Sequence, residues 1–280
     1  MASLERENSL EREMEIARRI QASFLPQEIP QVPGWEIAAR FQPARQVAGD
    51  FYDVFPLVQN RRLGLVIGDV CDKGVGAALF MALFRTLIRA FAQQHHALRW
   101  MDALAEDSPA QHLRNGRPVL PSTGTSALKN AIELTNNYIA TTHGSTHMFA
   151  TLFFGVLDPS NGMLLYVNGG HEYPLLVNSA GVKEKLAVTG PLIGVFPGAQ
   201  FEIQSVVIEP GDTLVAFTDG VTEAQNSVDE FYGRGRLYAL MARSVSTAAE
   251  LLDIIEASVR EFMGEADPSD DIALLALRRQ

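Results

Sequence analysis

The chain has 280 residues and is 47% hydrophobic, which is enough for one large domain with a substantial buried core. Its formal net charge of −10 argues against nucleic-acid binding, because proteins that bind the phosphate backbone usually carry a basic patch. The single cysteine, Cys71, excludes an internal disulfide, the N-terminal segment is charged, and no apolar run approaches the ~18 residues of a membrane span. We therefore expect a cytoplasmic protein that neither binds nucleic acid nor enters a membrane.

The first predicted element is an amphipathic helix over residues 4–25, which ends at Pro26. Its apolar stripe has the spacing of one helix face and consists of Leu10, Met14, Ala17, Ile20 and Phe24. The prolines that follow indicate a linker, so we expect a linker or regulatory helix in residues 1–30 and the main domain in residues 31–280. The stripe needs an apolar partner, and the sequence leaves two open: the following domain, or a second copy of the helix in a homodimer.

Beyond this linker, predicted strands and helices alternate in blocks. Runs rich in β-branched and aromatic residues predict strands at 35–41, 51–57, 63–67, 149–157, 163–167, 173–177, 201–208, 213–217 and 272–277. Helical periodicity predicts helices at 75–97, 126–141, 236–241 and 248–262, and residues 106–125 have the composition of a surface loop. Hairpin spacing of the strands implies antiparallel pairing, so this order indicates an α+β fold with helices layered on antiparallel sheets.

Four aspartates stand beside glycine or a second aspartate where a predicted strand ends or a turn begins. They are Asp50, Asp69, Asp219 and Asp270, the last of which is followed by Asp271. A carboxylate at the end of a buried strand is held rigidly at the sheet edge, and a neighbouring glycine lets backbone carbonyls approach a cation. Carboxylate oxygens favour Mg²⁺ or Mn²⁺ over zinc, and a cation would neutralise the repulsion between them. Each Asp-Gly pair alone is more often a turn, so only the whole pattern predicts a metal site.

Five sequence strings, in this order, resemble the SpoIIE/RsbU-type branch of the PPM (type 2C-like) serine/threonine phosphatases. They are QVAGDFYD at 46–53, GDVCDKG at 68–74, NGGH at 168–171, FTDGVTEA at 217–224 and DDI at 270–272, and the match covers most of the chain. The resemblance implies a PPM-type α-β-β-α sandwich, in which helices flank two antiparallel sheets and an N-terminal linker helix precedes them. It also implies two divalent cations, Mn²⁺ or Mg²⁺, at the sheet edge.

Carried over by position, the resemblance also assigns the metal ligands. They are Asp50, Asp69, Asp219 and Asp270, which would also be the catalytic residues, together with the backbone carbonyl of Val70 and, behind them, Asp271. Asp69 would bridge both cations, and Asp219 and Asp270 would complete the shell of one. Asp50 and Val70 would serve the other cation. The adjacency of Asp270 and Asp271 leaves open which of them is the direct ligand. A water activated by two cations needs no protein nucleophile.

Five further side chains lie inside or near the matching strings. Arg45 resembles a phosphate-gripping arginine in position, with a solvent-exposed strand residue as the alternative. His171 follows two glycines, and we favour a hydrogen-bonded structural imidazole over a general acid. For Lys73 we favour a surface charge over a substrate contact. For Asp53 we favour a strand-end hydrogen-bonding residue over a metal ligand. Asp72 stands where the family frequently has glycine, which is a turn-compatible change.

The predicted function is that of a metal-dependent phosphoprotein phosphatase, which hydrolyses phosphoserine or phosphothreonine on a partner protein. By resemblance, the partner is a phosphorylated anti-sigma-factor antagonist of the STAS type. Two alternatives are a non-catalytic partner-binding module on the same fold and a metallohydrolase of small phosphoesters, because an acidic metal site does not encode the leaving group. The presence of all four ligand aspartates argues against the first alternative.

Overall fold

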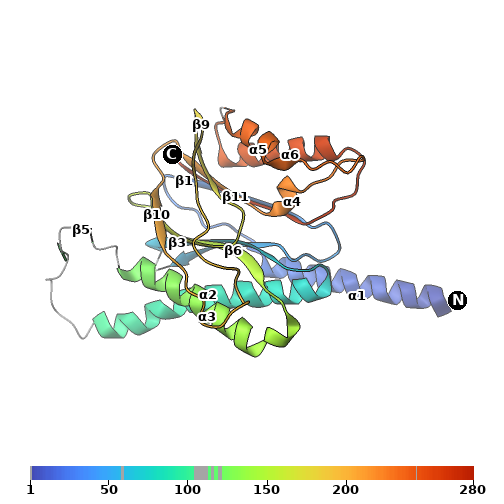
Figure 1. The fold of residues 1–280 in the computed structure, drawn as a ribbon, viewed down its shortest axis with the longest axis horizontal. Helices are drawn as coiled ribbons and strands as arrows, with labels where there is room; N and C mark the ends of the chain where they lie inside the picture. The colour runs from blue at the N-terminus through green and yellow to red at the C-terminus, as the bar shows by residue number, and fades with distance from the viewer. Residues whose placement is uncertain (1, 58–59, 104–112, 115–116, 119–121, 244) are drawn as a thin grey trace.

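The computed structural model describes residues 2–57, 60–103, 113–114, 117–118, 122–243 and 245–280. Two five-stranded antiparallel sheets lie face to face, and helices cover the outer face of each (Figure 1). The predicted α+β sandwich of two antiparallel sheets flanked by helices is confirmed.

Each sheet combines strands from distant parts of the chain. Sheet A has the order β1-β12-β11-β8-β9, with β1 (Trp35–Gln42), β8 (Leu175–Asn178), β9 (Gly181–Lys185), β11 (Thr213–Phe217) and β12 (Ile272–Arg279). Sheet B has the order β10-β7-β6-β3-β2, with β2 (Phe51–Leu57), β3 (Arg62–Val70), β6 (Ala150–Asp158), β7 (Met163–Gly169) and β10 (Gln204–Val207). A separate two-stranded ribbon joins β4 (Leu113–Arg114) and β5 (Arg117–Pro118).

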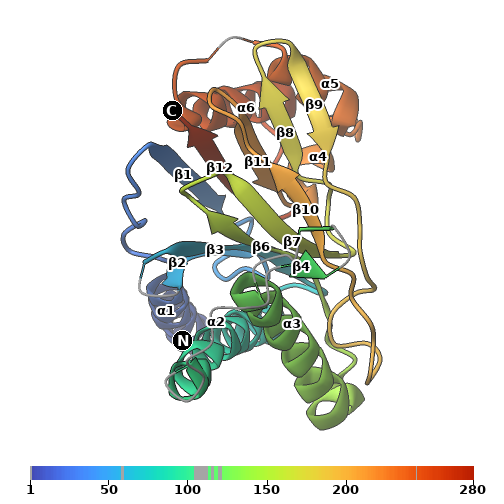
Figure 2. The ribbon, with the colours of Figure 1, turned by 90° about the vertical axis from the view of Figure 1, so that its left-hand side faces the viewer.

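The helices divide between the two outer faces, as Figure 2 shows. Sheet B packs against α2 (Val75–Ala103) and α3 (Ser122–Thr142), which a 3₁₀ turn (Gly144–Thr146) follows, and sheet A packs against α6 (Ala248–Met263). The short α4 (Asp219–Thr222) contacts β12, and α5 (Gly233–Met241) contacts β9. The helix α1 (Ala2–Phe24) contacts α2, and its N-terminal half extends beyond the sheets (Figure 1). Thr247 caps the N-terminus of α6, because its hydroxyl accepts a hydrogen bond from the backbone N–H of Glu250.

The hydrophobic core has three parts, one between the sheets and one beneath each helical layer. The central strand β3 is buried on both faces, which explains why its sequence is apolar without alternation. Ile67 faces the inter-sheet core, whereas its neighbour Val66 faces α2 and α3. Sheet B therefore packs against sheet A on one face and against α2 and α3 on the other.

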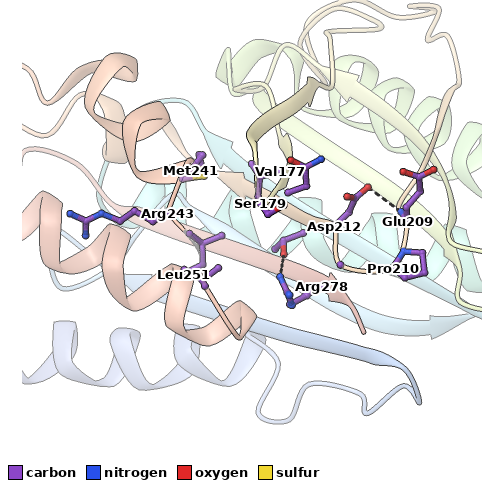
Figure 3. A pocket seen from close by; sticks show the side chains of 13 residues that line it. Val177, Ser179, Glu209, Pro210, Asp212, Met241, Arg243, Leu251 and Arg278 are labelled. Atoms are coloured by element: carbon purple, nitrogen blue, oxygen red, sulfur yellow. Dashed lines mark hydrogen bonds between the residues drawn. The ribbon is translucent and has the colours of Figure 1, made fainter.

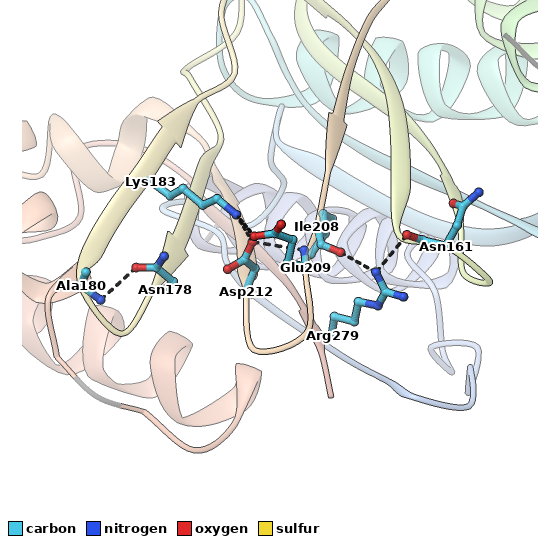
Figure 4. A network of polar contacts seen from close by, with 8 residues as sticks. All are labelled: Asn161, Asn178, Ala180, Lys183, Ile208, Glu209, Asp212 and Arg279. Atoms are coloured by element: carbon cyan, nitrogen blue, oxygen red, sulfur yellow. Dashed lines mark hydrogen bonds and ion pairs between the residues drawn. The ribbon is translucent and has the colours of Figure 1, made fainter. Parts of the chain in front are cut away.

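A polar network closes one end of the sandwich (Figure 4). The guanidinium of Arg279 in β12 donates to the carbonyl oxygens of Asn161 and Ile208 at 2.9 Å, which joins sheet A to the ends of β7 and β10. Lys183 in β9 pairs with Glu209 and with Asp212, the latter at 2.8 Å. These contacts lie at the end where β12 finishes and β11 begins, so the opposite end is where the predicted site strings meet.

Several predicted boundaries differ from the structure. β3 continues to Val70, so Asp69 lies within the strand and not just after it. β9 was not predicted, because the polar side chains of its Lys-Glu-Lys run resemble a loop. Most of the predicted 106–125 loop lies outside the described residues, and residues 122–125 belong to α3.

Contrary to the expectation that no segment is long and apolar enough to span a membrane, one helix among the described residues, α2 from Val75 to Gln94, has that length and composition. Its residues Met81, Phe84 and Ile88 are fully buried in the core beneath sheet B. Arg85 of the same helix pairs with a buried carboxylate of β2. These contacts bury one face of α2, whereas Val75 and Leu79 of the same helix are exposed.

Candidate metal centre

The predicted ligand aspartates lie at the end of the sandwich opposite the polar network. Asp50 directly precedes β2 and Asp69 is the penultimate residue of β3, and the pairing of Phe51 with Gly68 makes these aspartates neighbours. In sheet A, Asp219 opens α4 just after β11, and Asp270 lies just before β12. The structure thus brings four aspartates together from two sheets and from sequence positions up to 220 residues apart.

The carboxylates of this cluster destabilise each other's charge. Asp50 is 2% exposed, and its Oδ2 atom has no hydrogen-bond partner among the described residues. Burial and then the charge of Asp69 hold the pKa of Asp50 well above its ordinary value. Burial, and second to it the charge of Asp219, raises the pKa of Asp69 to about 7. Burial, and second to it the charge of Glu223, raises the pKa of Asp219 to about 6. A divalent cation among these groups would relieve this repulsion.

Asp271 holds the chain that leads to Asp50. Its Oδ1 atom accepts the N–H of Ala44 and its Oδ2 atom accepts the N–H of Gly49, both at 2.8 Å. Burial raises the pKa of Asp271, and these two N–H groups oppose the shift. Since both of its oxygens serve the 44–49 loop, Asp271 is placed to orient the loop, and the adjacent Asp270 is the better candidate for direct metal binding.

The glycines beside the aspartates have a packing role that the sequence did not reveal. A Cβ atom on Gly49 would lie 2.8 Å from the carbonyl oxygen of Val70, and one on Gly220 would lie 1.9 Å from that of Asp271. Both positions therefore require glycine because two backbone segments approach each other closely. The sequence pattern predicts that these glycines let backbone carbonyls approach a cation, and the structure gives close backbone packing as the reason for glycine.

Lys73 reaches across the site and contacts one predicted ligand. Its Nζ atom lies 2.7 Å from Oδ2 of Asp270, and the residue is exposed, so Lys73 is a surface charge as predicted and is also paired with a predicted ligand. Among the described residues, no three acidic, histidine or cysteine side chains enclose a metal ion as they stand. The chemistry of the donor set nevertheless fits a hard divalent cation, because it combines carboxylates of raised pKa, a buried unpartnered Asp50 oxygen and an ammonium already held on Asp270.

His171 lies beneath the cluster as a buried structural group. It is 3% exposed, and its Nδ1 atom lies 2.8 Å from the hydroxyl of Thr151, the residue that pairs with Asp69 across β3 and β6. Burial lowers the pKa of His171 to about 4, so the ring is neutral at physiological pH. The interpretation of His171 as a hydrogen-bonded structural imidazole agrees with these contacts.

Of the two remaining candidates, Arg45 lies on an exposed loop and Asp53 is buried in a strand. Arg45 is exposed on the loop between β1 and β2, directly after Ala44, and its role in phosphate binding stays a prediction. Asp53 lies inside β2 and not at a strand end, and it is 1% exposed. Its carboxylate pairs with Arg85 at 3.1 Å and with Arg89 at 3.2 Å, so it anchors α2 to sheet B.

Gln21 of α1 is a site-adjacent residue that the sequence analysis missed. Its side-chain amide donates to the carbonyl oxygen of Ala48 at 2.6 Å, and its amide oxygen accepts the N–H of the same residue at 2.9 Å. Gln21 is buried, whereas Leu10 and Ile20 of the predicted apolar stripe are exposed. No sequence signal marks this contact, because its partner is backbone. It joins α1 to the loop that ends at Asp50.

A cavity of about 400 Å³ lies far from these aspartates, between sheet A and the connection from α5 to α6 (Figure 3). Thr213 and Arg278, which line it, stand at the ends of β11 and β12 remote from the acidic cluster. Arg278 donates to the Thr213 hydroxyl at 3.3 Å. None of the predicted site residues lines this cavity, so it is separate from the candidate metal centre.

Comparison with known proteins places this geometry in a family. The model of the family of stage II sporulation protein E (SpoIIE) matches residues 59–280. Protein IcfG of Synechocystis is 44% identical over 274 residues, which cover 95% of this chain and 41% of IcfG. The phosphoserine phosphatase RsbU of Bacillus subtilis is 26% identical, over 98% of this chain and 72% of RsbU. This chain thus spans less than half the length of IcfG.

The fold also matches solved structures. The PP2C domain of SiaA from Pseudomonas aeruginosa superposes with a TM-score of 0.72 at 19% identity, and the match covers 100% of both chains. At this identity the likeness concerns the fold, and it includes the whole of the two-sheet sandwich and its flanking helices.

Proposed function

Because this chain belongs to the SpoIIE family of PPM-type phosphatases, we propose that it is a metal-dependent phosphatase that hydrolyses phosphoserine or phosphothreonine on a partner protein. One observation carries the proposal for this chain: buried or half-buried aspartates from both sheets meet at one end of the sandwich with raised pKa values. Such a cluster is unfavourable without a cation, and divalent cations are what a PPM-type reaction requires.

The residues of the site divide into proposed metal ligands and residues that position these ligands. Asp69 would contact both cations, Asp219 and Asp270 would hold one, and Asp50 with the Val70 carbonyl would hold the other. When bound, two divalent cations supply acidified water and neutralise the charge on the transferring phosphoryl group. The positioning groups are the carboxylate of Asp271, which fixes the 44–49 loop, and the neutral ring of His171, which fixes Thr151 beside Asp69.

Removal of divalent cations should abolish turnover. We expect phosphate release from a phosphoserine peptide to fall by at least about 100-fold in excess chelator, and to return when Mn²⁺ or Mg²⁺ is added in excess. Parallel assays with a nucleotide and an aryl phosphate test the alternative of a small-phosphoester hydrolase. Undiminished activity in chelator would exclude the proposed mechanism.

For the partner, we propose a phosphorylated STAS-type anti-sigma-factor antagonist, acted on in the cytoplasm. The support is the similarity to RsbU, which is named a phosphoserine phosphatase. The direct test is to add this chain and Mn²⁺ to phosphoproteins of the source cell and to identify by mass spectrometry which one loses phosphate. Loss of phosphate from unrelated proteins but not from a STAS-domain protein would contradict this partner.

We further propose that α1 is a regulatory element and that its exposed apolar face, with Leu10, Ile16 and Ile20, mediates homodimerisation. The contact between Gln21 and Ala48 gives α1 a direct path to the loop before Asp50. Replacing Gln21 by alanine removes two hydrogen bonds, each worth about 1 kcal/mol.

The Gln21→Ala variant should therefore need roughly three- to tenfold more Mn²⁺ for half-maximal activity than the wild type. Gln27→Ala is the matched control, because among the described residues the Gln27 amide donates to the nearby carbonyl oxygens of Ala22 and Leu25 and to no residue of the 44–49 loop. Superimposable Mn²⁺ titrations for wild type and Gln21→Ala would show that α1 is only a tether.

A further inference from the structure

Lys73 links the turn after β3 to the loop before β12 in the candidate metal centre. It lies in the turn between β3 and α2, where Asp72 adopts a left-handed conformation with φ of 71° and accepts the N–H of Lys73 at 2.8 Å. The side chain then crosses to the loop before β12, where its ammonium donates to the carbonyl oxygen of Ser269 at 2.7 Å and pairs with Asp270. The backbone of this turn therefore aims Lys73 at a predicted ligand.

Both carboxylate oxygens of Asp270 are engaged. Oδ1 accepts the N–H of Asp271 at 2.9 Å, and Oδ2 lies 2.7 Å from Nζ of Lys73. A divalent cation that binds Asp270 must either take the place of the ammonium or approach while a positive charge stands on the same carboxylate. Either route costs free energy, because like charges repel and a hydrogen-bonded ion pair has to be broken.

We propose that Lys73 is a resident cation on Asp270 that competes with the divalent metal and sets its affinity. This inference rests on the proposed function, because it assigns Asp270 to a metal. The side chains of Lys73 and Asp270 are 37% and 33% exposed, so the pair is weak enough to be displaced. Lys73 acts through Asp270 and is a positioning residue that tunes when the centre fills.

The direct test is the affinity of the metal-free chain for Mn²⁺, measured by isothermal titration calorimetry without any substrate. Lys73→Met removes the competing charge and keeps the length and apolar stem of the side chain, so Mn²⁺ should bind roughly tenfold more tightly. Lys73→Arg keeps the charge and should stay within about threefold of the wild type. Lys183→Met is the matched control, because Lys183 pairs with Glu209 and Asp212 at the far end of the sandwich (Figure 4).

An unchanged or weaker affinity in Lys73→Met overturns the proposal. If Lys73 instead binds the substrate phosphate, the variant raises KM and leaves the Mn²⁺ isotherm unchanged, which also overturns it. A wild-type chain that binds no Mn²⁺ contradicts the proposed function itself, whereas equal isotherms for wild type and Lys73→Met contradict only the role of Lys73.

A second measurement reports on the amine directly. Amine acetylation by an N-hydroxysuccinimide ester, quantified by mass spectrometry, should become several-fold faster at Lys73 when Mg²⁺ is added, because the metal frees the ammonium from Asp270. The rate at Lys183 should not change. Equal or slower labelling of Lys73 with Mg²⁺ would show that the ion pair persists, and would overturn the displacement.

Discussion

Replacing Asp69 by asparagine should lower kcat on the order of 1,000-fold while the chain keeps its fold. Asp69 is proposed to contact both cations, so loss of its charge weakens the whole centre and not one ligand position. The substitution keeps the size of the side chain and removes a charge that burial and Asp219 already disfavour. A wild-type rate in Asp69→Asn, at saturating Mn²⁺, would place the active site elsewhere.

The same variant has a second, opposite effect on the stability of the metal-free chain. The pKa of Asp69 is raised to about 7 from 3.8, so the unfolded state ionises first as the pH rises. The resulting destabilisation develops between these two pKa values and is complete above the higher one. In chelator, Asp69→Asn should therefore melt a few degrees above the wild type at pH 8, and this difference should shrink toward pH 4.5.

A control separates this effect from a general loss of negative charge. Asp253→Asn removes an exposed carboxylate of α6 that pairs with Arg40, and it should shift the melting temperature little at either pH. Equal melting curves for wild type and Asp69→Asn at pH 8 would indicate that repulsion within the acidic cluster is small.

The fold could be predicted because its signals are local or repeated. The apolar runs of β2 and β11 have the predicted bounds, and the order of strands and helices indicated helices layered on antiparallel sheets. The sandwich of two sheets followed from the family resemblance. The placement of the aspartates at strand ends predicted a shared metal site, but the assignment of each aspartate to one of two cations came only from the family resemblance. Asp50 and Asp270 are 220 positions apart, and no periodicity in the sequence relates the starts of β2 and β12.

What the sequence could not reveal are contacts that depend on backbone atoms or on two long side chains. Gln21 binds the backbone N–H and C=O of Ala48, which every residue type except proline presents. Lys73 meets Asp270 only because the turn at Asp72 and the loop before β12 face each other. In the same way, the sequence indicates only that Gly220 is a turn residue. The structure shows that the carbonyl oxygen of Asp271 occupies the space that a Cβ atom on Gly220 would need.

The second large effect concerns the anchor of α2, the helix that follows β3, which carries Asp69. Asp53 is 1% exposed, and its carboxylate is shared by Arg85 and Arg89, with the Arg89 guanidinium also 5.1 Å from the centre of the Phe55 ring. Burial raises the pKa of Asp53, and the two arginines oppose that shift. In this buried cluster, the charge of Asp53 is stabilised by the two arginines, and Arg85 in turn has Asp53 as its counter-ion.

Asp53→Asn should lower the free energy of unfolding by on the order of 3 kcal/mol, because it leaves the largely buried charge of Arg85 without its counter-ion. Urea unfolding of the chelated chain measures this difference, and Arg40→Met, which breaks the more exposed pair with Asp253, should cost less than about 1 kcal/mol. Combining Asp53→Leu with Arg85→Met replaces the central pair by apolar groups and should recover most of the loss, since the penalty comes from the unpaired charge and not from the missing attraction. A double variant as unstable as Asp53→Asn would show instead that the ion pair itself holds α2 on sheet B.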